Sequence, residues 1–505
     1  MRIFVDNYRV RIRTVRTSSG KYALQVVSKH QDKLTVHKHI GSYGTDDEKS
    51  ILLLKAKAFI DSRDDIQHDL FEKQPLFSHL SDIKITQSQS LFLYRLLSRI
   101  YETLGLNIFT DKVVRDLIIA RVYKPVSKRE TIDILEDSFG KTYSLKTIYR
   151  HLKKAIDHGV KEKFQSALIS FAKKGLNDSL HLVFYDVTTL AFDSHAKAGL
   201  KDFGYSKDHR FQDVQIVVGL VVNRDGFPLY FDVFNGKTFE GKTFITVVEK
   251  VKNILNNPNL VVVADAAMIS HINIEELDKR HIGFIVGARL ANLPSKLQIQ
   301  ISSNIQGSDL KTTIVKYLNH RLICQYLSSR AVKDRSDRDK QIEKAKNIIL
   351  SPSRISSRFR FVKTMNGKYE VNDTLIEKSK LLEGIKGYLT NTDLDEAEVI
   401  SRYHDLWRIE KAFRITKTDL EARPIFLRLD KTITCHLIIV FAELAIARYL
   451  EIKTNMSIKR ILKIAGKILT HKVIVKKTGE TGFIETTIED LKLRGQLEKL
   501  RVLGH

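Results

Sequence analysis

Four apolar runs and one helical pattern in the middle of the chain constrain its fold more than any other feature. The runs at 181–188, 212–222 and 227–236 have the length and branched apolar residues of strands. A helical pattern at 242–255 follows, and 260–267 is again strand-like. Three strands, a helix and a further apolar strand predict a mixed sheet with helices packed against it.

The composition describes a folded and strongly basic protein. The 505 residues include 84 Lys and Arg against 59 Asp and Glu, which gives a formal net charge of +25, and 43% of the residues are hydrophobic. This hydrophobic content supports ordinary cores, and the length exceeds that of a single core. The charge favours a polyanionic partner, and nucleic acid is a better candidate than a membrane because no amphipathic anchor accompanies it.

Cysteine usage and targeting patterns favour a cytoplasmic protein. Cys324 and Cys435 are too far apart for a Cys-x-x-Cys motif, so we expect two buried thiols in a reducing compartment. The N-terminus shows no apolar run typical of a secretory signal. The longest apolar stretch, 433–450, contains charged residues, which favours a buried helix over a membrane span. We therefore expect no membrane partner.

Alternating residues near the N-terminus predict a basic three-stranded meander. From 8 to 16, arginines occupy one face and apolar residues the other, and strand-like runs follow at 21–30 and 33–44. Thr45 and Glu48 have the capping-box spacing of a helix that continues to residue 60. This segment is either a small cap with a solvated charged face or a surface that contacts DNA.

Helical patterning dominates 88–174. Within it, 130–139 and 144–154 form two short helices separated by a break at Gly140, which is compatible with a helix-turn-helix. Plain packing in a helical bundle is the alternative, and the pattern does not decide between them. The second helix carries four basic candidates for DNA contact: Lys146, Arg150, Lys153 and Lys154.

Two acidic residues follow buried apolar runs. Asp186 comes after 182–185, and Asp265 comes after 260–264. A carboxylate at the end of a buried strand is held rigidly, which suits a ligand for a hard divalent cation. Each residue alone could equally be a loop or helix-capping Asp.

A third acid, Glu410, lies in a helix predicted at 394–418. At about 100° per residue, four polar side chains share one narrow face of this helix: Tyr403, Glu410, Arg414 and Lys417. An adjacent apolar stripe can pack on the sheet. An acid in this place can complete a metal site, and the cations can bind phosphates. The alternative is an ordinary Glu410–Arg414 pair on a solvated face, which spacing alone favours.

Three motifs resemble those of insertion-sequence transposases of the DDE class. They are YDVTT around Asp186, VVVADAAMIS around Asp265, and Y-x6-E-x6-K in the Glu410 helix. The likeness extends over about 182–450 and is greatest to the bacterial branch with the YREK signature, Y-x2-R-x3-E-x6-K. In that branch a long spacing between the second Asp and the Glu, as here, corresponds to an insertion domain within a ribonuclease-H-like fold.

One position departs from this signature. Leu406 stands where the branch has Arg, and Arg408 lies on the opposite side of the predicted helix, so any role of that Arg does not transfer. Use of a DNA hairpin therefore stays open. Trp407, the only Trp, either stacks on a base or is a buried structural residue, and the second interpretation is favoured.

The resemblance implies roles for the candidate residues. Asp186, Asp265 and Glu410 would be catalytic and would hold two Mg2+ (or Mn2+) ions. Three further side chains would contact DNA phosphates: Tyr403, Arg414 and Lys417. Their partner would be double-stranded DNA, as terminal inverted repeats and as target DNA.

The implied fold is α/β, with a ribonuclease-H-like mixed-sheet catalytic core interrupted by a β-rich insertion domain. A basic β-meander and a helical domain precede this core. The expected segments are 1–78 for the meander and its helix cap, 88–178 for the helical domain, 179–290 and 386–450 for the two parts of the catalytic core, 291–385 for the insertion domain, and 451–505 for a tail that serves dimerisation or DNA binding.

The function implied is that of a transposase that binds the inverted repeats of its own element, cleaves the ends and transfers the 3′ ends to target DNA. Pairing two ends implies a homodimer on DNA, located at the nucleoid in a bacterial cytoplasm. Two alternatives are a metal-dependent nuclease of the same fold that does not join DNA, and a DNA-binding regulator that has lost catalysis. The presence of all three acids counts against the regulator, since clustered negative charge disfavours DNA binding.

Overall fold

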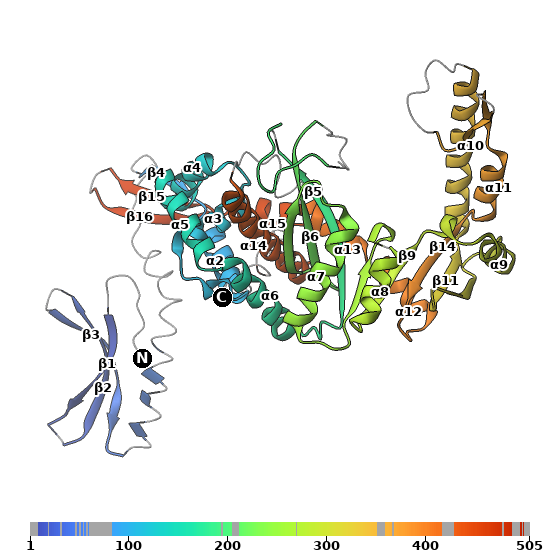
Figure 1. Ribbon diagram of the computed structural model, residues 1–505. Helices are drawn as coiled ribbons and strands as arrows, with labels where there is room; N and C mark the ends of the chain where they lie inside the picture. Colours follow the sequence, from blue (N-terminus) through green and yellow to red (C-terminus); the bar gives the residue numbers. More distant parts are fainter. Residues whose placement is uncertain are drawn as a thin grey trace. The chain divides into compact units, whose positions relative to one another are not determined.

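The structure is a computed structural model in which two compact parts of the chain are distinguished (Figure 1). The first unit comprises Met1–Gln87 with Lys472–Phe483, and the second comprises Ser88–His471 with Ile484–His505. The described residues are 9–18, 20–30, 33–45, 83–192, 195–204, 212–268, 270–350, 359–365, 368–416, 429–476 and 479–486, with isolated positions between 48 and 59 and between 495 and 498.

The first unit contains a three-stranded antiparallel sheet of order β1-β2-β3. Its strands are β1 (Arg9–Arg16), β2 (Tyr22–His30) and β3 (Lys33–Tyr43). Leu24 and Val26 of β2 are buried in a small core, whereas Arg11 and Arg13 of β1 are exposed. Another sheet, of order β16-β15-β4, combines β4 (Ile83–Gln89) with the hairpin of β15 (Thr470–Val475) and β16 (Thr481–Glu485).

Helices α2 to α6 follow in the second unit, and capping side chains mark where several of them begin. Asp111 caps α3, Ser127 and Glu130 form a capping box at α4, and Ser144 caps α5. Gly140, with φ of 64°, ends α4 in the left-handed conformation that favours glycine. The helices are α2 (Leu91–Thr103), α3 (Lys112–Tyr123), α4 (Lys128–Phe139), α5 (Leu145–Asp157) and α6 (Val160–Gly175).

An eight-stranded mixed sheet of order β10-β11-β14-β9-β8-β5-β6-β7 forms the centre of the second unit (Figure 1). β5, β8 and β9 are parallel to one another, and all other neighbouring pairs are antiparallel. The expected β-β-β-α-β order is confirmed, with α7 (Glu240–Leu255) preceding β8. The strands are β5 (Leu182–Ala191), β6 (Gln215–Asn223), β7 (Pro228–Asn235), β8 (Val261–Ala264), β9 (Gly283–Ala288), β10 (Thr312–Tyr317), β11 (His320–Tyr326) and β14 (Ile385–Thr390).

The segment between β9 and β14 extends this sheet and adds a helical arm. β10 and β11 join the sheet because β11 pairs with β14. The arm consists of α10 (Ser328–Leu350), α11 (Asp373–Leu381) and the hairpin of β12 (Val362–Met365) and β13 (Lys368–Val371), and it has a small core of its own around Phe361. α9 (Ser295–Ile305) packs on β10, and α8 (His271–Lys279) connects β8 to β9.

Helix α14 (Asp430–Thr454) is long and apolar enough to cross a membrane, but its most apolar window is 94% buried within the protein. It packs against α3, α5 and β7. Its Glu443 accepts a hydrogen bond from Arg121 of α3 at 2.9 Å, so each of these buried groups has a polar partner in the core. α14 is thus a central core helix, as its charged residues predicted.

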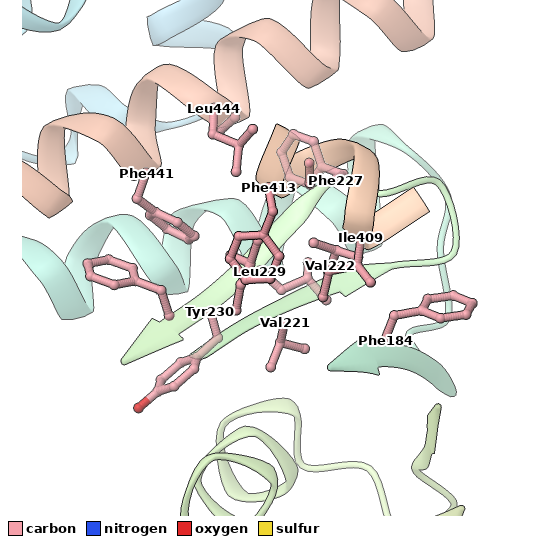
Figure 2. Packing of buried hydrophobic residues seen from close by; sticks show 14 of the residues in the cluster. Phe184, Val221, Val222, Phe227, Leu229, Tyr230, Ile409, Phe413, Phe441 and Leu444 are labelled. Carbon is pink, nitrogen blue, oxygen red and sulfur yellow. The ribbon is translucent and has the colours of Figure 1, made fainter. Parts of the chain in front are cut away.

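The helix that carries Glu410 is held between the sheet and α14. In α13 (Trp407–Arg414), Ile409 and Phe413 are buried and point toward Val222 and Leu229 of the sheet (Figure 2). On its other side, Phe413 lies near residues of α14, since both line one small apolar pocket. Glu410 lies outside this buried face and is exposed.

Candidate catalytic site

Asp186 lies in β5, and Asp265 directly follows the neighbouring parallel strand β8. Tyr185 of β5 is paired with Ala264 of β8, and the next residue along each chain is one of the two acids. Adjacent strands are about 4.8 Å apart, and paired positions present their side chains to the same face. Because β5 continues to Ala191, Asp186 lies within its strand and not near the end that the apolar run suggested. The two carboxylates are therefore neighbours in space.

Backbone amides contact both of these carboxylates. Oδ1 of Asp186 accepts a hydrogen bond from the amide of Val187 at 2.7 Å, and Oδ1 of Asp265 accepts one from the amide of Ala266 at 2.5 Å. These bonds orient each carboxyl group relative to its own strand.

The predicted helix at 394–418 is two helices, which corrects the projection that placed Tyr403 and Glu410 on one continuous face. α12 (Glu396–His404) ends at a turn of Asp405 and Leu406, and α13 begins at Trp407. Hydrogen bonds between residues three apart tighten this turn, with the amide of Leu406 donating to the carbonyl of Tyr403 at 3.2 Å. The two side chains therefore reach the site from different helices.

Tyr403 fills a niche on the sheet next to Asp265. Its hydroxyl donates to Oδ1 of Asp265 at 3.4 Å, and its ring meets that of Tyr388 edge-on, with centroids 5.0 Å apart. Gly287 of β9 makes this position possible, because a Cβ there would lie 2.3 Å from the Tyr403 hydroxyl. Burial, followed by the charge of Asp265, raises the pKa of Tyr403. Only 7% of Tyr403 is exposed, so in this structure its hydroxyl contacts the acid.

Lys386 of β14 is a component of the site that sequence analysis missed. Its Nζ lies 4.6 Å from the centre of the Tyr403 ring, and the charges of Asp265 and Glu410 act on it. Burial is the main cause that lowers the pKa of Lys386, Arg330 lowers it further, and the two acids oppose this change. Lys386 thus places a cation over the Tyr403 ring, where the charges of Asp265 and Glu410 act on it. Only the pairing of β14 with β9, two segments far apart in sequence, brings it there.

The other predicted residues of this region have different environments. Leu406 is buried in the turn, and Arg408 pairs with Asp405 at 3.1 Å and with Asp225 at 3.6 Å, so Arg408 does not take the place of the missing signature Arg. Trp407 is 53% exposed, so the expectation of a buried structural Trp was wrong. Arg414 is exposed at the end of α13, and Lys417 lies outside the described residues.

Helix α5 presents its basic residues on one exposed face. Ile148 and Leu152 face the core, while the four predicted candidates are exposed: Lys146, Arg150, Lys153 and Lys154. Tyr149 is exposed among them. Cations and an aromatic ring on one helix face are suited to a nucleic-acid surface, and their role in DNA contact stays a prediction.

The donor set of the three acids fits a hard divalent cation, since carboxylates offer only oxygen ligands. Asp186 and Asp265 each follow one residue of the pair Tyr185–Ala264, and the charges of both Asp265 and Glu410 act on Lys386 and Tyr403. Within the described part of the chain, however, no three His, Cys, Asp or Glu side chains gather closely enough to share an ion. The acids are near one another without forming one coordination shell.

A comparison with protein families identifies the family of this chain. Residues 179–445, more than half of the chain, match the family model described as the transposase DDE domain. The comparison with curated proteins gives no match.

Two solved structures show a weak likeness. A synaptic complex of piggyBac transposase with hairpin DNA has a TM-score of 0.36 at 9% identity, with 75% of this chain and 70% of that chain covered. Argonaute of Marinitoga piezophila in complex with a 5′-OH guide RNA has a TM-score of 0.23 at 11% identity, with 82% and 78% covered. At these scores neither likeness informs the function.

Proposed function

Because the chain belongs to the family with a transposase DDE domain, we propose that it cleaves the ends of a DNA element and joins them to target DNA. The observation that supports this proposal is the pairing of Tyr185 in β5 with Ala264 in β8, because Asp186 and Asp265 are the next residues along the two segments. In the first step water attacks a phosphodiester at the element's end and releases a 3′-hydroxyl. In the second step that hydroxyl attacks a phosphodiester of the target, forming a new bond and releasing a target 3′ end.

Asp186, Asp265 and Glu410 would hold two Mg2+ (or Mn2+) ions in this ribonuclease-H-like core. When bound, such ions stabilise the entering and the leaving oxygen of phosphoryl transfer. Glu410 is exposed on the short helix α13, so its carboxylate is available as the third ligand.

The remaining residues of the site would position DNA. Tyr403 orients Asp265 through its hydroxyl, and Lys386 supplies a cation beside the acids. Arg414 and Lys417 would bind phosphates next to the cut. The basic face of α5 would contact bases or phosphates of the terminal inverted repeats. Trp407 is exposed and is therefore available to stack on a base. A homodimer on DNA would pair two ends.

The test compares Asp265→Asn with the matched variant Asp373→Asn, which changes an exposed Asp on α11 away from the site. Each protein is incubated with DNA that carries an end of the element and with Mg2+, and strand cleavage is followed on gels. We expect Asp265→Asn to lose cleavage and Asp373→Asn to keep it.

Full cleavage by Asp265→Asn would remove the assignment of the metal site. Products that contain element DNA joined to target DNA distinguish a transposase from a nuclease that only cuts. Light scattering of the protein on end DNA tests the dimer, and one copy per end would contradict it.

A further inference from the structure

A basic cavity of about 560 Å³ lies between the ends of β9 and β14 and the helices α10 and α11. Its volume is within the range of about 300–1,000 Å³ typical of ligand sites. Six of its lining side chains are basic and two, Asp334 and Asp337, are acidic. The basic ones are Arg289, Arg330, Arg338, Arg360, Lys378 and Lys386.

Acidic residues compensate only part of this positive charge. Arg330 pairs with Asp334 at 3.3 Å, and Arg338 pairs with Glu383 at 2.6 Å. Among the described residues, Arg289 and Lys378 have no carboxylate within ion-pair distance. An excess of cations in a concave surface concentrates anions there.

The guanidinium of Arg338 is a buried donor in the cavity wall. It is only 7% exposed, its Nη1 pairs with Glu383, and its Nε lies 3.8 Å from Asp339 without a hydrogen-bond partner within the described part of the chain. A buried donor without a hydrogen bond costs stability, and an anion with acceptor oxygens would supply that bond.

Lys386 relates this cavity to two of the three acids. It lines the cavity, and it is also the residue on which the charges of Asp265 and Glu410 act. A strand of DNA that has a phosphate at these acids would therefore be within reach of a residue that lines the cavity. The cavity is too small for a duplex, whose major groove alone is about 12 Å wide.

We infer that the cavity binds the sugar–phosphate backbone of a single DNA strand next to the bond that is cut. Its cations hold phosphates, and its apolar residues, such as Leu290 and Leu382, contact the sugars. This inference rests on the proposed function. It adds a binding site supplied by the segment between β9 and β14.

The test uses the double variant Arg289→Gln and Lys378→Gln, with Lys346→Gln as the control on an exposed face of α10 outside the cavity. The probe is a fluorescein-labelled single-stranded oligothymidylate without divalent ions, and its affinity is measured by anisotropy across a series of salt concentrations. The slope of log affinity against log salt should become shallower by about 0.7 for each phosphate that the variant no longer neutralises. Circular dichroism verifies that the variants are folded.

A shallower slope in the double variant, with no change in Lys346→Gln, supports the inference that the cavity binds a single DNA strand. An unchanged slope overturns the inference, and so does an equal change in Lys346→Gln, because that would reflect net charge alone. Cleavage of end DNA by the wild-type protein is measured separately. Failure of that cleavage refutes the proposed function, whereas an unchanged slope with intact cleavage refutes only the cavity.

Discussion

Replacing Gly287 by Ala should displace Tyr403 from Asp265. The new Cβ would lie 2.3 Å from the hydroxyl of Tyr403 and 3.0 Å from its Cζ, well inside the separation of about 3.5–4.0 Å at which atoms pack. The ring cannot move freely, because Tyr388 packs against it and Lys386 lies over it. The substitution therefore overpacks the niche.

Overpacking of this kind costs about 1–3 kcal/mol. Loss of the hydrogen bond to Asp265 adds little, since that bond is long at 3.4 Å. In a Tyr403→Phe background the closest atom is absent, so Gly287→Ala should cost less there. The difference between the stability cost of Gly287→Ala in the wild-type background and its cost in the Tyr403→Phe background measures the clash with the Tyr403 hydroxyl.

Urea denaturation gives the stability of each variant, and Mg2+-dependent cleavage reports the site. Gly482→Ala is the control, because a Cβ there would have its nearest neighbour, Val473, at 3.8 Å. We expect Gly287→Ala to lose both stability and cleavage, and Gly482→Ala to keep both. A Gly287→Ala protein as stable and as active as the control would refute the packing of Tyr403 over β9.

Three other changes have definite expected outcomes. Burial raises the pKa of Glu443 to about 8, although Arg121 acts to lower it. The folded protein therefore binds this proton more tightly than the unfolded chain, in which the pKa of the carboxyl group is near 4.5. Stability should therefore fall as pH rises between these values, and Glu443→Gln should remove that slope in urea melts at a series of pH values. Lys386→Met keeps the aliphatic stem but removes the charge, so cleavage should slow by about 10- to 100-fold with little change in melting temperature; an unchanged rate would exclude Lys386 from the site. Arg150→Gln should reduce the salt slope of duplex binding by about 1, and Lys174→Gln on α6 should not; equal slopes would mean that α5 does not contact phosphates.

The strands and the two acids associated with them were predictable because a buried strand has a recognisable pattern of apolar residues. β5, β6 and β8 are almost entirely buried and therefore consist largely of apolar residues, so the Asp within β5 and the Asp after β8 are conspicuous. The order of these runs then limits how the strands can connect. Local patterning was sufficient for this part of the fold.

The interrupted Glu410 helix was not predictable from local patterning. The turn at Asp405 and Leu406 contains neither Gly nor Pro, and the apolar period continues through it. The break accompanies tertiary packing, because Tyr403 is seated over β9 while Leu406 is buried beside α13. A helical projection treats 394–418 as one straight helix, so it cannot take into account the tertiary contacts of Tyr403 and Leu406.

Lys386 was missed for a related reason. Nothing in its neighbourhood in sequence marks it, and its partners belong to strands and helices far along the chain. The exposure of Trp407 was likewise misjudged, since an apolar ring at the start of a short helix can face either way. Contacts of this kind are set by the register of distant segments.

The position of α14 determines when the protein can fold during synthesis. Glu443 is joined to Arg121, which was made 322 positions earlier, and the thiol of Cys435 donates to the carbonyl of Leu152. At about 5–20 residues per second, a ribosome takes about 15–60 s to cover that separation. During this time α3 and α5 lack the helix that covers them, so an interrupted chain would offer its apolar surface to chaperones and proteases. The N-terminal helices are therefore completed only when translation is almost finished.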